Sequence, residues 1–144
     1  MFDRPYDVRL NSWIELRNNL NSSTRPFEEV QEFWNKAPFI PFNRYVDPYN
    51  QQSWPTPWEI LEENKYDDFT KSLMIAWTLK LSNKFHQSSI ELHTVIDKHR
   101  FREYNLIYVD GKKVLNYDDT GPIDVDFIPG GLYLQNMVII NTPR

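Results

Sequence analysis

The chain of 144 residues contains no cysteine, and this absence excludes disulfide bonds, thiolate metal sites and cysteine nucleophiles together. It has only four glycines, which do not form a Gly-rich loop of the kind that cradles phosphate groups. It also lacks an apolar run of membrane-spanning length and the basic-then-apolar start typical of a secretory signal. We therefore expect a soluble chain that has no recognisable export signal and does not bind a membrane.

Positive charge is in the minority, since the formal net charge is −4 and no basic block stands out, so we do not expect nucleic-acid binding. Aromatic residues are abundant at 15%, and ten prolines accompany the four glycines. This combination indicates rigid loops packed by aromatic side chains rather than flexible linkers. The length suits a single domain over residues 1–144, with a helical part at 1–83 and a β-sheet part at 88–144.

One stretch, residues 64–83, is the expected centre of the fold. Asp67 and Asp68 stand where a helix begins, so their carboxylates can accept free backbone N–H groups and offset the positive end of the helix dipole. From Phe69 onward, apolar residues occupy nearly the whole circumference. A helix of this kind is normally enclosed by the rest of its domain, so we predict a buried central helix at about 67–82.

Helical patterns precede this stretch and strand patterns follow it. The predicted helices cover 5–20, 26–35 and a short segment that starts at Thr56-Pro57-Trp58-Glu59, where a capping box and a first-turn proline coincide. The predicted strands cover 90–97, 104–109, 112–118 and 132–140, with an Asp110-Gly111 hairpin turn and a mostly buried last strand. The sequence thus predicts an α+β fold in which N-terminal helices and the buried central helix pack on a C-terminal antiparallel sheet.

The loop at 37–55, which we call the aromatic loop, has two interpretations. It contains four prolines and the aromatic residues Phe39, Phe42, Tyr45, Tyr49 and Trp54. Either the aromatic side chains fix an irregular loop to the core, or part of the loop is a docking surface for another protein. In the second interpretation the candidate contacts are Phe42, Arg44, Tyr45, Tyr49 and Trp54, while Phe39 anchors the loop to the first two helices.

Groups that could support metal binding or catalysis are sparse. Glu91, His93, Asp97 and His99 would share one face of a strand running to residue 99, and we expect a solvated polar face there rather than a metal site. Asp67 and Asp68 are adjacent on a helix, so their carboxylates diverge, and helix capping explains them. We expect no metal and no cofactor.

Two segments resemble the transglutaminase-like and related papain-like domains, including short ones carried by tailed phages. Asn64-Lys65-Tyr66-Asp67-Asp68-Phe69 is similar to the segment that opens the buried helix of that family, and Tyr104 to Asp118 is similar to its two following strands. In the family, the helix start carries a cysteine, the first strand a histidine and the next strand an aspartate. The resemblance covers about residues 57–119.

The resemblance implies a degenerate catalytic site near Tyr66, Arg102 and Asp118. Tyr66 stands where the cysteine would be, and the histidine would fall near Arg102 or Glu103, neither of which can replace it. The aspartate would fall at Tyr117 or Asp118. The implied protein is an inactive domain and not an enzyme.

A fold kept without its catalytic groups indicates binding or assembly. We expect a structural protein of a tailed-phage virion (neck, tail or baseplate) whose partners are other virion proteins, located in the virion if it is viral and in the cytoplasm otherwise. One alternative is a cysteine-independent hydrolase or transferase on the same fold that uses Asp118 with His93 or His99. Another is a small regulatory binding module.

Overall fold

The computed structural model of the protein describes residues 1–118 and 121–143, and over these residues four α-helices precede a five-stranded antiparallel sheet. The α+β class predicted from the sequence is confirmed. Along the chain the elements are α1 (Tyr6–Leu20), α2 (Pro26–Asn35), the 3-10 helix η1 (Gln51–Ser53), α3 (Pro57–Glu63), α4 (Asp68–Lys80), β1 (Ile90–Asp97), β2 (Arg102–Val109), β3 (Lys113–Leu115), β4 (Ile123–Asp124), the 3-10 helix η2 (Val125–Phe127) and β5 (Leu132–Ile139). The strand order is β4-β3-β2-β1-β5. Each helix in the described residues is too short or too polar to cross a lipid bilayer.

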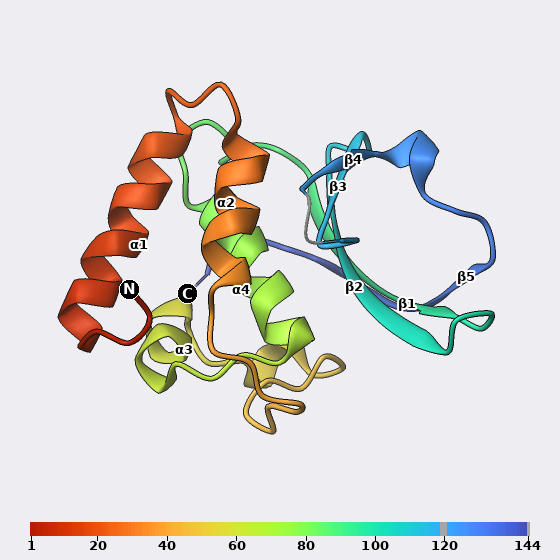
Figure 1. The fold of residues 1–144 in the computed structure, drawn as a ribbon, viewed down its shortest axis with the longest axis horizontal. Coiled ribbons are helices and arrows are strands. Elements are labelled where there is room, and N and C mark those ends of the chain that lie inside the picture. Colours follow the sequence, from red (N-terminus) through yellow and green to blue (C-terminus); the bar gives the residue numbers. More distant parts are fainter. Residues whose placement is uncertain (119–120, 144) are drawn as a thin grey trace.

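Helix α4 lies at the centre of the fold, between α1 and α2 on one side and the sheet on the other (Figure 1). Ten of its thirteen residues are buried, Trp77 among them, which confirms the predicted core helix. Asp67 is its N-cap: one carboxylate oxygen accepts hydrogen bonds from the Thr70 backbone N–H (2.8 Å) and the Thr70 hydroxyl (2.6 Å). The cap satisfies a backbone donor that the start of a helix would otherwise leave unpaired.

Helix α3 begins and ends as its sequence predicts. The Thr56 hydroxyl accepts the Glu59 N–H at 3.2 Å, and the Thr56 N–H donates to the Glu59 carboxylate at 3.0 Å, so the capping box is complete. Pro57 fills the first helical position, where a backbone donor is not needed. The helix stops at Asn64, which adopts a left-handed conformation with φ 59°. This short connection places Tyr66 and Asp67 directly before α4.

The hairpin of β2 and β3 turns at Asp110-Gly111, as predicted. Both residues have positive φ (53° and 66°), which is the combination a type I′ turn requires. Strand β3 is shorter than the predicted 112–118, because Asn116 adopts a left-handed conformation (φ 65°) that leaves the strand. The Asn116 side chain is buried, so the left-handed backbone at this residue directs its amide into the interior.

Both faces of the sheet carry apolar residues. One face packs on α4 as part of the main core, which includes Leu92 and Ile107. A second, smaller cluster, formed by Val95, Tyr104, Leu106 and Val114, occupies the opposite face and is partly covered by side chains of the segment from β4 to β5.

The predicted solvated face of β1 is therefore only partly correct. The strand ends at Asp97, so His99 lies in the following turn, and Asp97 itself is buried. One Asp97 carboxylate oxygen accepts the backbone N–H groups of His99 (3.0 Å) and Arg100 (3.2 Å). These bonds stabilise the turn between β1 and β2 and explain the buried carboxylate.

The prediction that the last strand is mostly buried is wrong. Among the described strands, β5 is an edge strand that pairs with β1 alone, and five of its eight residues are exposed. Its apolar run is typical of a strand covered on both faces, but this chain covers β5 on one side only. A register shift at Thr94/Val95 divides the pairing into two regular parts, Asn136 to Ile139 and Leu132 to Leu134, and leaves Gln135 between them without a partner in β1.

Candidate functional site

The start of α4, strand β2 and the end of β3 meet at three polar side chains, Asp68, Asn105 and Asn116. The Asn105 amide donates to one carboxylate oxygen of Asp68 at 2.9 Å, and the Asn116 amide donates to the other at 3.4 Å. The Asn116 amide also donates to the Asn105 carbonyl oxygen at 3.0 Å. These are the elements on which the resemblance expects catalytic groups, but they present one carboxylate and two amides.

Further polar groups extend this cluster through the interior. The Ser72 hydroxyl donates to the Asn105 carbonyl at 2.6 Å and accepts from the Asn116 amide. The Thr94 hydroxyl donates to the Asn105 side-chain oxygen at 2.9 Å, and the Gln31 side-chain oxygen accepts the Asn116 N–H at 3.1 Å. In this cluster the Asp68 carboxylate accepts from the two asparagine amides, while the Ser72 and Thr94 hydroxyls donate to oxygens of Asn105. The network connects α2 and α4 to β1, β2 and the residue after β3.

The three residues named by the resemblance lie in different surroundings. The Tyr66 ring is buried against Phe2 and Trp34, its hydroxyl has no hydrogen-bond partner among the described residues, and burial raises its pKa. Arg102 is exposed at the start of β2, with its guanidinium 4.6 Å from the Tyr104 ring centroid. The Asp118 carbonyl accepts the Gln31 amide. The polar side chain of β2 that reaches Asp68 is thus Asn105, three residues after Arg102.

The alternative pairings of Asp118 with His93 or His99 are not favoured by the arrangement. His93 stacks on Tyr108 on the sheet face opposite α4 and contacts the Glu91 carboxylate at 2.8 Å. His99 lies in the turn of the β1–β2 hairpin, at the far end of the molecule from α1 (Figure 1). In the described residues, no group of three or more histidines and carboxylates is placed to hold a metal ion.

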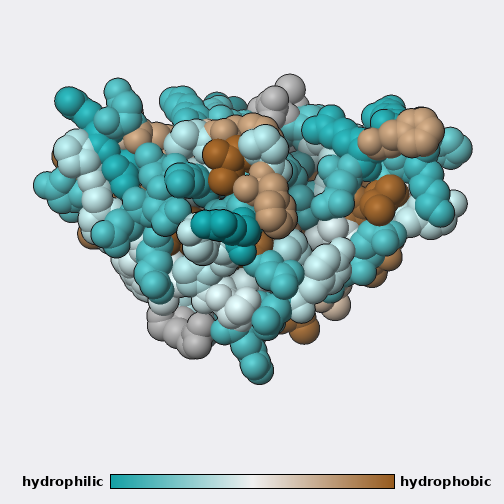
Figure 2. All heavy atoms as spheres, turned by 90° about the horizontal axis from the view of Figure 1, so that it is seen from below, coloured by the Kyte–Doolittle hydropathy of each residue, from teal (hydrophilic) through white to brown (hydrophobic). Residues whose placement is uncertain are grey.

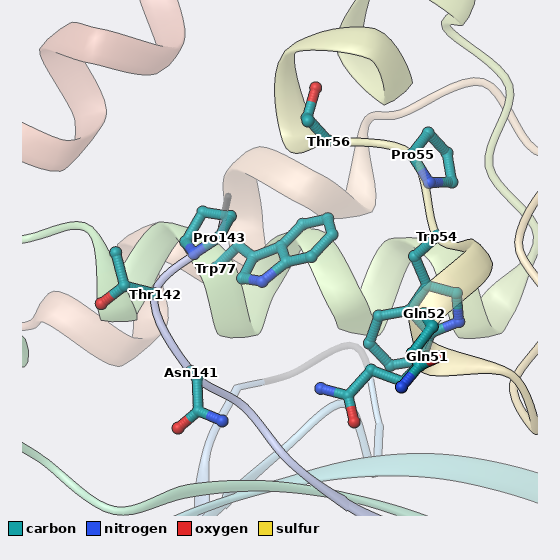
Figure 3. A pocket seen from close by; sticks show the side chains of 9 residues that line it. All are labelled: Gln51, Gln52, Trp54, Pro55, Thr56, Trp77, Asn141, Thr142 and Pro143. Carbon is teal, nitrogen blue, oxygen red and sulfur yellow. The ribbon is translucent and has the colours of Figure 1, made fainter.

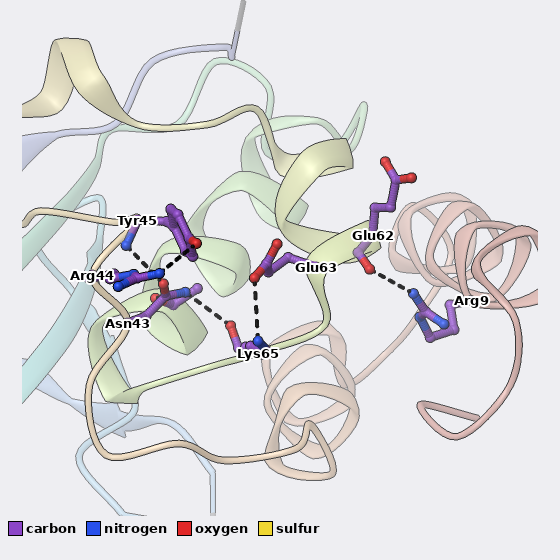
Figure 4. A network of polar contacts seen from close by, with 8 residues as sticks. Arg9, Asn43, Arg44, Tyr45, Glu62, Glu63 and Lys65 are labelled. Atoms are coloured by element: carbon purple, nitrogen blue, oxygen red, sulfur yellow. Dashed lines mark hydrogen bonds and ion pairs between the residues drawn. The ribbon is translucent and has the colours of Figure 1, made fainter.

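The aromatic loop is fixed to the fold by its backbone and by three buried side chains, those of Asn43, Val46 and Trp54. The Asn43 N–H donates to the Asp67 carboxylate at 2.9 Å, and its amide donates to the Lys65 carbonyl at 3.1 Å (Figure 4). The Ile40 N–H donates to the Tyr66 carbonyl at 3.0 Å. The same carboxylate therefore caps α4 and holds the loop.

Most aromatic side chains of the loop point into solvent. Their exposed fractions run from 53% for Tyr45 to 72% for Phe42, with Phe39 and Tyr49 between them. Arg44 is also exposed, with its guanidinium 5.2 Å from the Tyr45 ring centroid and bonded to the Tyr45 hydroxyl at 3.1 Å (Figure 4). Seen from the side of this loop, hydrophobic side chains reach the surface in separate groups bordered by hydrophilic ones (Figure 2).

Two expectations for the loop need correction. Trp54 is not an available contact residue, because its ring is buried against Phe69 and Trp77 and its indole N–H donates to the Asp47 carbonyl. Phe39, the expected anchor, is 71% exposed, because its backbone rather than its ring joins the fold through a bridge to Tyr66. The predicted contact set therefore keeps Phe42, Arg44, Tyr45 and Tyr49.

Two grooves border the loop on the side of the C-terminal segment. One has a volume of about 260 Å³ and lies between Trp54, Trp77 and the segment Asn141–Pro143 (Figure 3). The other, of about 420 Å³, separates Pro48 and Tyr49 of the loop from Met137 and Ile139 of β5. The Asn136 amide crosses to the loop and donates to the Pro48 carbonyl at 3.0 Å. Loop and edge strand are thus neighbours and form one surface.

Two exposed features differ from the sequence prediction or were not singled out by it. In β5, which we predicted to be mostly buried, the side chains of Tyr133, Leu134, Met137 and Ile139 are exposed, and we call these four the apolar edge. At the β1–β2 turn, the short basic run Lys98-His99-Arg100-Phe101-Arg102 carries Phe101, which is 94% exposed with φ 52°. The single phenylalanine within this basic run was the available signal.

Comparison with known proteins finds no family model, no curated protein and no solved structure that matches this chain. Its function is therefore argued from its own surface and interior.

Proposed function

We propose that this protein is a non-catalytic assembly component, specifically a virion protein of a tailed phage, which binds other virion proteins through its aromatic loop. The proposal includes an inactive transglutaminase-like fold. The observation that carries it is that Phe42, Tyr45 and Tyr49 stay in solvent although the loop backbone is fixed. Exposed aromatic side chains on a fixed segment are typical of binding hot spots.

The fixed backbone matters because ordering a flexible segment costs free energy on binding. Asn43 holds the loop through backbone and side-chain hydrogen bonds, and Val46 and Trp54 are buried beneath it. Arg44 and Tyr45 are held against each other by a hydrogen bond and a cation–π contact. Binding of a partner to this surface would therefore lose little conformational entropy in ordering the loop.

The interior supports the inactive assignment. A helix start and two strands converge, as the resemblance implies, but the groups that meet there are Asp68, Asn105 and Asn116. The phenol of Tyr66 is buried among aromatic rings, and burial raises its pKa, so it stays protonated at neutral pH. A protonated phenol without a neighbouring base is not an activated nucleophile.

The test is incorporation of the Phe42→Ala/Tyr45→Ala double variant into particles of the encoding phage, together with its thermal unfolding. We expect a melting temperature close to that of the unchanged chain and a loss of incorporation, because both side chains contact solvent in the isolated protein. Aromatic hot spots typically cost about 2 kcal/mol or more of binding free energy when truncated. Quantitative mass spectrometry of gradient-purified particles gives the readout.

Phe101→Ala is the control, since it removes a still more exposed phenylalanine (94% against 72% for Phe42) from the β1–β2 turn, outside the aromatic loop. It should melt and incorporate like the unchanged chain. Absence of the unchanged chain from purified particles would contradict the virion role. Normal incorporation of the double variant with early melting would show that the loop side chains act in folding instead.

A further inference from the structure

The outer edge of β5 offers unpaired backbone groups. The Ile140 N–H donates to the Ile90 carbonyl at 2.9 Å, and Val138 lies opposite Leu92. In an antiparallel pair, backbone groups point alternately toward and away from the neighbouring strand. Because residues 138 and 140 point toward β1, the N–H and C=O groups of Met137 and Ile139 point out of the sheet.

This edge lacks the charged residues and prolines that usually protect an edge strand, and the register shift at Gln135 lies outside its last part, from Asn136 onward. Residues Leu132 to Ile140 include no charged residue and no proline. The side chains of Met137 and Ile139 are 43% and 57% exposed, and both lie on the sheet face opposite α4. Natural edge strands usually carry lysine, proline or other charges that prevent pairing with another chain. A bare edge of this kind is a template for strand addition.

We propose that β5 pairs antiparallel with β5 of a second copy of this chain, about a two-fold axis at Val138. In this register, Met137 lies opposite Ile139 of the second copy, and Ile139 opposite its Met137. Each of these pairs uses residues whose backbone groups point outward, so each can exchange two hydrogen bonds. The register shift at Gln135 ends the regular part of the edge, and through the Met137 and Ile139 pairs the two sheets become one continuous sheet.

A second copy fits the edge better than an unspecified partner because β5 is complementary to itself. In the two-fold register, Met137 lies opposite Ile139 and Val138 opposite Val138 of the second copy, so apolar side chains meet at the centre of the contact. No charge on β5 opposes the pairing, and a symmetric edge-to-edge contact closes as a dimer. The groove of about 420 Å³ beside Met137 and Ile139 has no charged residue in its lining either.

The first test is sedimentation velocity of the unchanged chain and of Met137→Lys and Ile139→Lys at micromolar concentrations. The unchanged chain should form dimers, and each variant should dimerise at least tenfold more weakly, since a lysine there would face an apolar side chain of the second copy. Val8→Lys is the matched control: Val8 is 40% exposed on α1, away from the sheet. It should dimerise like the unchanged chain. Circular dichroism checks that all variants remain folded.

The second test uses the absence of cysteine from the chain. Paired residues at hydrogen-bonded antiparallel positions have Cα atoms about 5.5 Å apart, which suits a disulfide. The double variant Met137→Cys/Ile139→Cys should therefore form covalent dimers on mild oxidation with diamide. Neither single variant should, because residue 137 does not face residue 137 in this register.

A monomeric unchanged chain overturns the inference, and so does a dimer that persists in both lysine variants. Efficient cross-linking of either single cysteine variant overturns the register. The dimer proposal rests on the proposed function only in the idea that exposed apolar surface is a protein contact. Failure of the dimer can be distinguished from failure of the proposed function, because the Phe42→Ala/Tyr45→Ala variant tests incorporation without changing β5. Dimers that form normally in a loop variant that is not incorporated would support both proposals.

Discussion

Helix α4 and strand β5 are two apolar segments with opposite outcomes. Ten of the thirteen residues in α4 are buried, whereas five of the eight in β5 are exposed. The sequence of each suggests a core element. The difference lies in the neighbours, because α4 has helices on one side and the sheet on the other, while β5 pairs with β1 alone among the described strands and has the aromatic loop beside it.

The comparison separates two uses of apolar residues. Burying apolar surface is the main favourable term in folding, and α4 uses it within the chain. In β5 and the aromatic loop the apolar surface remains in water, where it contributes little to the stability of an isolated molecule. Large exposed apolar areas in soluble proteins mark interaction sites. Substitutions in the two regions should therefore affect different measurements.

The largest expected effect is that of Trp77→Ala in α4. Removing a buried tryptophan should lower the free energy of unfolding by about 3–5 kcal/mol, as for other large aromatic truncations in cores. Ile139→Ala in β5 should change it by less than about 1 kcal/mol in the monomer, because the side chain is already 57% exposed. Urea unfolding of the two variants at a concentration that keeps the chain monomeric gives the comparison. Equal losses would abolish the distinction between the two segments.

A smaller effect is expected from Asn116→Ala in the polar network between α4 and the sheet. The substitution removes the amide that bonds to Asp68, Ser72 and the Asn105 carbonyl. Buried polar groups that lose their partner cost about 1–3 kcal/mol, so the unfolding free energy should fall by that amount. An exposed asparagine, Asn50, serves as the control and should tolerate alanine. No change in Asn116→Ala would mean that the network does not hold α4 to the sheet.

Thr56→Ala tests the start of α3. Loss of the hydroxyl that accepts the Glu59 N–H should cost about 1 kcal/mol, the usual value for an N-cap. Thr56→Ser keeps the hydroxyl and should restore most of the loss. Chemical denaturation measures both, and a serine variant as unstable as the alanine variant would exclude the cap as the cause.

The smallest effect concerns Tyr66, whose hydroxyl is buried without a hydrogen-bond partner. Tyr66→Phe removes this hydroxyl, so we expect no loss of stability and a gain of up to about 1 kcal/mol. Burial raises the pKa of the Tyr66 phenol, so the folded chain holds this proton more tightly than the unfolded chain. Stability should then fall as the pH rises above about 10, the ordinary pKa of tyrosine, and less steeply in Tyr66→Phe. Equal alkaline slopes in both proteins would contradict this assignment.

Local signals in the sequence predicted most of the fold. Helix caps at Thr56 and Asp67, the Asp110-Gly111 turn and the apolar circumference of α4 all depend on residues close together in the chain. These features form as expected because the interactions that determine them are local.

Features that depend on distant residues were predicted less well. The exposure of β5 depends on whether another strand lies beyond it, which its own sequence does not specify. The convergence of Asp68, Asn105 and Asn116 depends on the register of two strands against a helix. The loop gave a mixed result, because proline and aromatic content predicts a stiff loop but not that Trp54 is buried while Phe39 is exposed.

Amide hydrogen exchange along β5, followed by NMR at low and high protein concentration, shows directly whether a second copy covers this strand. We expect the Val138 and Ile140 amides, which point toward β1, to be protected at both concentrations. The Met137 and Ile139 amides point outward and should gain protection only at the higher concentration, where a second copy pairs with the edge. Exchange at residues 137 and 139 that is fast at every concentration would contradict the claim that another copy covers this apolar edge.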